Sequence, residues 1–364
     1  MAVSRINEAG LNVNQYGNRN VIINGAMQVA QRGTSFTGLG GSTGAVYNLD
    51  RFHTFDSATA GRATVTQESD GPDGFANSLK MACTTADTSV AAGEIFMLSQ
   101  RLEGQDLQQF AKGTSSAKPF TVSFYVKGNA AATYIVELID TDNSRQCSKT
   151  FSVTTAWTRI ELTFPADTTG VLDDDNARSF DLNIWLHAGS TYTSGTLNSS
   201  AFASTTNANR AVGGSSFFDS TSRTFFITGV QMEVGDTATD FEHRTFGDEL
   251  AKCQRYFLRS YDYGTATGTA TSTGSQATTA AVSQSYASAG TYNFPVEMRA
   301  TPTVTLYSTA NASTTGKVSA DGTDGTGSAS FVGTNSVFIL RSNDGGGVAA
   351  NVIMKAHLIA DAEL

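Results

Sequence analysis

The chain has 364 residues, which is enough for two domains of ordinary size that each bury their own core. Only 16% of the residues are charged, proline is scarce (5) and glycine is abundant (35), a profile that is typical of many short strands and turns and argues against a helical bundle. The net charge of −9 argues against nucleic-acid binding, because a phosphate-binding surface needs clustered Lys and Arg.

Residues 1–20 are polar and rich in asparagine, and we interpret them as an N-terminal arm that a partner protein anchors. They contain no apolar segment, so we expect no signal peptide. No run in the chain approaches the roughly 18 apolar residues that a membrane helix needs, so we expect no membrane span.

The three cysteines, Cys83, Cys147 and Cys253, are widely spaced and include no CxxC pair. This spacing argues against a zinc finger or a thioredoxin-like motif. We expect buried free thiols in a protein that is made in a reducing cytosol.

Short strands separated by Gly, Ser, Asp and Asn clusters dominate residues 21–245. Strict alternation of apolar and polar residues predicts antiparallel sheets packed as a sandwich of the jelly-roll type. The clearest strands are expected at 120–126, 134–139, 159–164 and 180–187, and the last one at 223–234. In the last strand the alternation places Phe225, Ile227 and Gly229 on one face and Phe226, Val230 and Met232 on the other.

A short helix is expected at 246–258, where Leu250, Cys253, Tyr256 and Phe257 have helical spacing. A helix this short is marginal in water by itself. We therefore expect these four side chains to form an assembly joint, buried against the C-terminal domain or against a neighbouring subunit.

Residues 259–364 are expected to form a smaller β-domain that mediates oligomerisation. Within it, residues 263–296 carry no charged side chain. This composition fits either a linker or strands that pair with neighbouring chains. The fold class is therefore all-β: a sandwich, a connecting helix and a C-terminal β-domain.

The polar face of the strand at 180–187 is the candidate ligand site. An exposed Trp beside carboxylate and amide groups suits a sugar, since the ring stacks on a pyranose and the polar groups bond its hydroxyls. The alternative is that a helix-free flap or another subunit covers the Trp. The candidate residues are Asp181, Asn183, Trp185 and His187, with Tyr125 expected on the same sheet face.

No metal, cofactor or catalytic site is predicted. The four histidines, His53, His187, His243 and His357, are far apart and form no HxxxH pair. The run Asp173–Asp175 lacks the spacing of a dedicated calcium loop, and nothing singles out a pair of catalytic carboxylates.

Several segments resemble those of tailed-bacteriophage tail-fibre and appendage proteins. Residues 20–34, NVIINGAMQVAQRGT, and 47–52, YNLDRF, are similar to the opening of those chains. Residues 120–127 and 157–164 resemble strands of their carbohydrate-binding-module-like jelly roll. Later segments with the same resemblance are 227–242, CQRYF at 253–257, FPVEMRATP at 294–302 and ADAEL at 360–364.

The resemblance implies a non-enzymatic virion component, made in the host cytoplasm, that assembles as a homotrimer and contacts other virion proteins and a host-surface glycan. It carries over no catalytic residues. Two alternatives remain open. One is a capsid decoration or head-fibre protein, and the other is a glycan-degrading tailspike, although the long β-helical repeats that are usual in tailspikes are absent.

Overall fold

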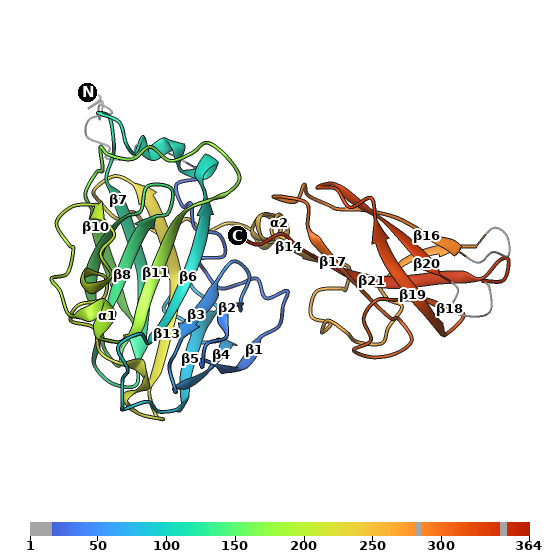
Figure 1. Cartoon of the computed structure of the whole chain (residues 1–364), viewed down its shortest axis with the longest axis horizontal. Coiled ribbons are helices and arrows are strands. Elements are labelled where there is room, and N and C mark those ends of the chain that lie inside the picture. The colour runs from blue at the N-terminus through green and yellow to red at the C-terminus, as the bar shows by residue number, and fades with distance from the viewer. Residues whose placement is uncertain (1–16, 281–285, 343–347) are drawn as a thin grey trace, which may run out of the picture. The chain divides into compact units, whose positions relative to one another are not determined.

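The computed structural model describes residues 17–280, 286–342 and 348–364 (Figure 1). These residues form two compact units. One contains the chain up to Ala30 together with Thr34–Arg244, and the other contains Gln31–Gly33 together with Thr245–Leu364. Most of the predicted N-terminal arm, residues 1–16, lies outside the described residues.

The N-terminal unit is a sandwich of two antiparallel sheets. The described strands of one sheet have the order β1-β4-β5-β13-β7-β10, and those of the other have the order β12-β9-β8-β11-β6-β3-β2. The chain passes repeatedly from one sheet to the other, as in a jelly roll. The predicted all-β fold class is confirmed. The strands are β1 (Ser35–Leu39), β2 (Gly44–Tyr47), β3 (His53–Ser57), β4 (Arg62–Glu68), β5 (Ser78–Thr85), β6 (Ile95–Glu103), β7 (Phe120–Gly128), β8 (Ala132–Asp140), β9 (Arg145–Val153), β10 (Thr158–Phe164), β11 (Arg178–Ala188), β12 (Ala203–Ser204) and β13 (Thr224–Val234).

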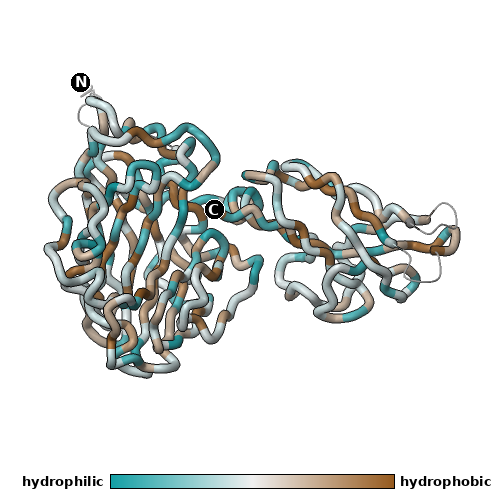
Figure 2. The backbone as a smooth tube through the Cα atoms, in the orientation of Figure 1, coloured by the Kyte–Doolittle hydropathy of each residue, from teal (hydrophilic) through white to brown (hydrophobic). Residues whose placement is uncertain are grey.

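The core lies between the two sheets, and Figure 2 shows hydrophobic and hydrophilic residues alternating along the strands. β7 and β11 bury the faces that the alternation predicts. Each contributes four side chains to one continuous core: Phe120, Val122, Phe124 and Val126 from β7, and Phe180, Leu182, Ile184 and Leu186 from β11. Aromatic rings continue this packing across the sheets, because Phe120 stacks on both Phe110 and Phe180.

The prediction for the last strand of the sandwich is wrong in its second half. Phe225 and Ile227 share one face as predicted and lie in the core, but Val230 and Met232, predicted on the other face, lie in the core too. The register between β13 and β7 shifts between Thr228 and Gln231. Gly229 lies within this bulge with a φ of 62°. An extra residue reverses the alternation beyond it, so the pattern read from the first half fails.

Asparagine side chains fix the segment that leads into the sandwich. The Asn24 amide donates hydrogen bonds to the carbonyls of Val29 and Asp50, and its oxygen accepts one from the Val29 N–H. Asn24 has a φ of 60°, which Asn tolerates better than most residues. The carboxamide of Gln100 bonds both backbone groups of Ile23. The NVIINGAM motif therefore replaces strand pairing with side-chain hydrogen bonds.

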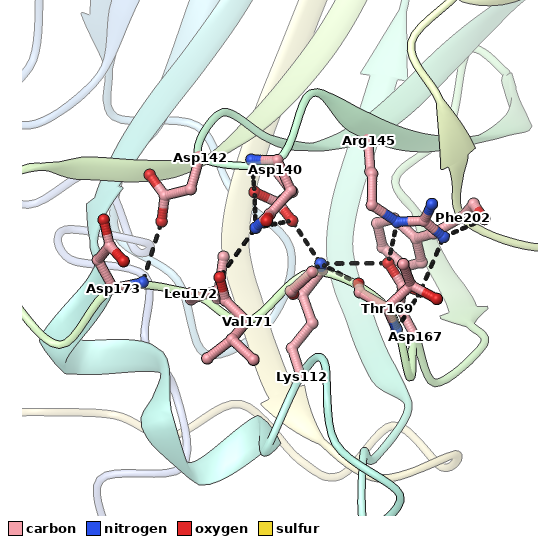
Figure 3. Close-up of polar contacts among 12 residues, drawn as sticks. Lys112, Asp140, Asp142, Arg145, Asp167, Thr169, Val171, Leu172, Asp173 and Phe202 are labelled. Atoms are coloured by element: carbon pink, nitrogen blue, oxygen red, sulfur yellow. Dashed lines mark hydrogen bonds and ion pairs between the residues drawn. The ribbon is translucent and has the colours of Figure 1, made fainter.

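A buried ion cluster holds one end of the sandwich together (Figure 3). The Lys112 ammonium, which follows the 3₁₀ helix η2 (Gly104–Phe110), pairs with Asp140 at the end of β8 and lies 3.1 Å from Asp167. It also donates to the carbonyls of Thr169 and Gly170. Arg145 donates two hydrogen bonds to Asp167, at 2.8 and 2.9 Å. Burial raises the pKa of Asp167, but the bonds from Arg145, Thr169 and Lys112 outweigh it and leave the pKa below its ordinary value.

The C-terminal unit is a second, antiparallel β-structure. Its described strands follow the order β14-β21-β18-β19-β20-β16, and β15 and β17 also pair with β21. The uncharged segment 263–296 contributes β15 and β16, which pair with β21 and β20 of the same chain, so pairing with neighbouring chains stays a prediction. Residues 281–285 lie outside the described residues. The elements are α2 (Phe246–Gln254), β14 (Phe257–Arg259), β15 (Gln276–Thr279), β16 (Tyr286–Asn293), β17 (Thr303–Tyr307), β18 (Lys317–Ala320), β19 (Thr323–Ser330), β20 (Ser336–Ser342) and β21 (Ile353–Asp361).

Three residues of the predicted joint are buried within this unit of a single chain. Cys253 has no exposed surface, Tyr256 is 1% exposed and Phe257 is 3% exposed, while Leu250 is half-buried. The helix α2 ends at Gln254, so Phe257 already belongs to β14, which pairs with β21. The burial of these side chains therefore requires no neighbouring subunit, and their part in assembly stays a prediction.

Residues from four of the motifs quoted above meet in the C-terminal unit. The Arg32 guanidinium pairs with Asp361 at 3.0 Å and Glu363 at 3.2 Å, and it lies 3.6 Å from the centre of the Phe257 ring. Gln31 donates a hydrogen bond to the carbonyl of Phe257. Arg299 donates hydrogen bonds to the carbonyls of Ala362 and Glu363. We call Arg32 and these contacts the arginine hub.

The cysteines and the helices agree with two further expectations. Cys83, Cys147 and Cys253 are free and buried, as predicted. Burial raises the pKa of the Cys147 thiol to about 11, so it is un-ionised at neutral pH. Within residues 17–280, 286–342 and 348–364, no helix is long and apolar enough to cross a membrane.

Replacing Lys112 with Met should lower the free energy of unfolding of the N-terminal unit by about 3–5 kcal/mol, because it leaves the buried Asp140 without its cation. Both tryptophans, Trp157 and Trp185, lie in this unit, so tryptophan fluorescence during urea denaturation reports on it alone. The matched control is Lys80→Met, which breaks a partly exposed pair with Glu68 and should cost about 1 kcal/mol or less. Equal losses of unfolding free energy in the two variants would contradict the assignment of Lys112 as the cation that stabilises the buried Asp140.

Candidate functional site

The outer face of the seven-stranded sheet carries most of the predicted ligand residues. Asp181, Asn183 and Trp185 lie on the side of β11 opposite the core residues, as the alternation predicts. The register aligns Asn183 with Glu137 on β8 and with Ser99 on β6. Ser99 in turn faces His53 on β3, which faces Tyr47 on β2. These five residues, Glu137, Asn183, Ser99, His53 and Tyr47, form what we call the polar row.

Trp185 is not an exposed platform. It is 1% exposed, and its indole N–H donates a hydrogen bond to Glu137 at 2.9 Å. The Tyr192 ring lies 5.3 Å from it, and the Arg210 guanidinium lies 4.9 Å from the ring centre. The expectation of an exposed tryptophan is therefore wrong. The alternative of a covering flap is right, but the flap is not helix-free as predicted. The flap is residues 189–216 of the same chain, which contain the short helices α1 (Ser190–Thr193) and η3 (Asn207–Asn209). We call it the cover.

Glu137 links the cover to the sheet. Its carboxylate has no exposed surface and accepts two hydrogen bonds from Arg210, at 2.7 and 2.8 Å. It also accepts hydrogen bonds from Asn183 and Trp185. A buried carboxylate is tolerated when it is paired and fully hydrogen-bonded, and the two-point contact with arginine is the strong form of such a pair. Burial lowers the pKa of Arg210, but Glu137 more than compensates and raises it.

Two of the predicted site residues lie elsewhere. Tyr125 is on β7, which belongs to the other sheet, and its ring packs near Phe75. Alternation assigns faces within a strand but does not say which sheet the strand joins, so this prediction is wrong. His187 is separated from Trp185 by a bulge and pairs with the core residue Phe96. Its ring packs edge-on against Phe218 of the core, away from the polar row.

Two buried polar atoms of the polar row have no hydrogen-bond partner. His53 is 2% exposed and Ser99 is 3% exposed, yet His53 Nδ1 and Ser99 Oγ are both unpaired within the described residues. The Tyr47 ring lies 5.0 Å from the His53 ring, and both Tyr47 and Phe55 on β3 are half-buried. Unpaired buried polar atoms are rare in proteins and indicate a bound water or ligand.

Arginines surround this part of the row. Burial lowers the pKa of His53 well below 6.5, and the positive charges of Arg101, Arg51 and Arg178 lower it further. Arg178 also donates two hydrogen bonds to Asp181. Burial raises the pKa of Asp181, against the effect of Arg178 and Arg101. The site therefore combines a neutral imidazole, a serine hydroxyl, half-buried aromatic rings and cationic side chains.

The sequence pattern does not predict five further members of this site, Glu137, Arg210, Ser99, His53 and Tyr47. The only available signal was the spacing of Tyr47 and His53, which lie six residues apart on adjacent strands that a short turn connects. The others come from strands or loops that are distant in the sequence.

Comparison with known proteins gives a fold likeness only. No protein family model and no curated protein matches the chain. Among solved structures, a family 11 carbohydrate-binding module from Clostridium thermocellum is 12% identical, with a TM-score of 0.28, over 56% of this chain and 97% of that one. The xylan-binding domain from CBM 22 is 12% identical, with a TM-score of 0.29, over 55% of this chain and 100% of that one.

The enzymatically active domain of tailspike protein 4 from bacteriophage CBA120 is 12% identical, with a TM-score of 0.30, over 59% of this chain. The match covers only 21% of that domain. At these identities and TM-scores the similarities do not extend to ligand, activity or origin.

The buried, neutral state of His53 predicts a loss of stability in mild acid. In the unfolded chain the His53 imidazole takes up a proton near pH 6.5, whereas in the folded protein it stays neutral at that pH. The free energy of unfolding is therefore fully present above that pH and decreases as the pH drops from about 7 to 5. Each such histidine contributes a slope of up to about 1.4 kcal/mol per pH unit. Tryptophan-monitored urea denaturation should show a shallower loss for His53→Gln than for the wild type. His243→Gln, at an exposed position, is the control. Equal slopes of unfolding free energy against pH in all three proteins would refute the attribution of the acid sensitivity to His53.

Proposed function

We propose that this protein is a non-enzymatic structural component of a tailed-phage virion, a tail-fibre or appendage protein. The observation that supports this most is the arginine hub, where residues from the QRGT, CQRYF, MRATP and ADAEL segments contact one another. These residues make ion pairs and backbone hydrogen bonds within a β-unit. Segments that resemble phage appendage proteins thus have mechanical roles here, as expected of a structural protein.

The glycan-contact part of the proposal rests on the polar row. His53 Nδ1 and Ser99 Oγ are themselves buried and suit a bound water beneath this face, because a water can donate to one and accept from the other. Tyr47 and Phe55 offer half-buried rings for stacking on a pyranose. Arg101, half-buried on the same face opposite Asp181, would bond further oxygens. The contact site is therefore shifted along the face from Trp185, which the cover occupies.

Glycan binding is tested with an array of bacterial surface polysaccharides. Tyr47→Ala and Arg101→Gln should each weaken binding about 10-fold, the effect of losing one stacking contact or one charged hydrogen bond. The matched control is Arg159→Gln on β10 of the other sheet, which should bind like the wild type. Equal weakening by the control would contradict the site, and no binding by the wild type would contradict glycan contact while leaving the virion role standing.

Labelling the intact particle with an antibody against the chain tests the virion role. Signal on the tail supports the proposal, and signal on the head favours the capsid decoration or head-fibre alternative. Absence from the particle refutes both.

The proposed assembly is a homotrimer, supported by the uncharged segment 263–296. Native mass spectrometry at micromolar concentration should give the mass of three chains. Ala277→Glu, at an exposed position on β15, should shift the distribution toward monomer, because it would place a charge in an interface. Ala312→Glu, exposed but outside the uncharged segment, is the control. A monomeric wild type would overturn the trimer.

A further inference from the structure

Three ligand-type side chains converge at the rim of the sandwich, away from the polar row. Asp87 follows β5, Glu94 directly precedes β6, and His187 is near the end of β11. A nitrogen of His187 and an oxygen of each carboxylate all lie within 4.8 Å of one another. The three residues are 5%, 3% and 1% exposed, respectively. We call them the rim cluster.

The local fold holds each ligand atom in place. The bulge in β11 turns His187 toward the core side, where antiparallel pairing with β6 brings it next to Glu94. His187 Nε2 lies 2.8 Å from Glu94 Oε2, and Glu94 Oε1 accepts a hydrogen bond from the Ala91 N–H. Asp87 accepts hydrogen bonds from the Thr59 hydroxyl and from the N–H groups of Ala60 and Ser89.

The charge of the rim cluster is unbalanced. Two buried carboxylates face one histidine, and in the described part of the chain neither Asp87 nor Glu94 forms an ion pair with Lys or Arg. Glu137 and Asp140, which are equally buried, pair with Arg210 and Lys112. Burying a carboxylate without a cation is costly, so a divalent cation would complete this cluster.

We propose that Asp87, Glu94 and His187 bind one zinc-type divalent cation, through His187 Nε2 and one oxygen of each carboxylate. One imidazole and two carboxylates are ligands that zinc accepts, whereas calcium and magnesium prefer oxygen alone. Each carboxylate oxygen has two lone pairs, and Glu94 uses only one on each oxygen for the contacts above. Three protein ligands leave the fourth tetrahedral position for a water molecule.

The surroundings of His187 match those of a metal-bound histidine. Its other ring nitrogen, Nδ1, lies 2.8 Å from the Ser216 hydroxyl. Such a contact fixes the ring orientation. When Nδ1 carries the proton and donates it to Ser216, Nε2 has none and can bind a metal in place of its contact with Glu94. Ser216 in turn accepts a hydrogen bond from the Phe218 N–H. The hydrogen-bonding groups that would support a metal-bound His187, the Ser216 hydroxyl and the Phe218 N–H, are therefore already in place.

The cation would also join the two ends of the cover. The cover begins at Gly189, whose N–H donates to the Glu94 carbonyl, and ends at Ser216, which contacts His187. Both ends are thus bound to residues of the rim cluster. The proposed role of the metal is structural: it holds the cover over Trp185, independently of what the polar row binds.

Metal titration of the untagged, chelator-treated full chain tests the proposal. Zinc should bind with a stoichiometry of one in isothermal titration calorimetry. It should raise the tryptophan-monitored melting temperature by roughly 5–10 °C at about 100 times the dissociation constant. Cobalt in place of zinc should give visible absorption bands of a four-coordinate site. Zinc binding should be lost in His187→Asn and Glu94→Gln.

The matched control is His357→Asn in the C-terminal unit. His357 is also fully buried and contacts a serine hydroxyl at 2.9 Å, but its other ring nitrogen faces a backbone carbonyl and no carboxylate. This variant should keep zinc binding. If the ligand variants fail to fold, the cobalt spectrum of the wild type decides the question. Absence of zinc and cobalt binding by the wild type, binding of calcium alone, or full zinc binding by folded His187→Asn would overturn the proposal.

Discussion

The guanidinium of Arg32 joins two separate parts of the C-terminal unit, the start of β14 and the end of β21 with the residues after it. Its side chain is only 13% exposed, and it pairs with Glu363, whose side chain is 5% exposed. A charge removed from water to this extent is stable only when partners are held in good geometry. The partners come from the last residues of the chain and from the Phe257 ring, so Arg32 fixes β14 and the end of β21 together. Side chains of a three-residue segment from early in the sequence therefore bind strands formed by residues more than two hundred positions later.

Contacts of the same kind explain why the motif residues have a structural role. Gln31, Arg32, Arg299 and Glu363 contact backbone groups or each other within the β-unit. None of these contacts uses a reactive group in a cavity. In the N-terminal unit, Asn24 and Gln100 likewise bond the backbone where a strand would otherwise pair. In segments such as 20–34 and 253–257, side chains thus replace regular backbone hydrogen bonding, which only a few residue types can do.

The sequence predicts faces well where a strand stays regular. Along β7 and most of β11 the pleat of the strand determines which side chains are buried. The alternation of apolar and polar residues in the sequence follows this pleat directly. It fails at the bulges near Gly229 and Leu186, because one extra residue changes the face of everything beyond it. No local pattern marks these two positions, apart from the glycine whose φ is positive.

The site is less predictable than the fold for a related reason. Asp181, Asn183 and Trp185 share a face because they share a strand, and this much follows from alternation. Glu137, Ser99 and His53 join them only through the register of four different strands, which no single segment encodes. The cover over Trp185 is a segment without regular alternation, so its docking depends on Arg210 reaching Glu137 across the sheet.

Buried carboxylates show how the sandwich handles charge, and they connect the site to the rim. Glu137 is neutralised by a guanidinium and Asp140 by an ammonium, and each pair attaches a loop to a sheet. In the middle of the cover this attachment is Arg210. At the two ends of the cover, the neighbouring side chains are two carboxylates and a histidine instead of a second arginine. A divalent cation provides there what Arg210 provides in the middle, since both offset buried negative charge while fixing parts of the cover that lie outside its short strand β12, which pairs with β9.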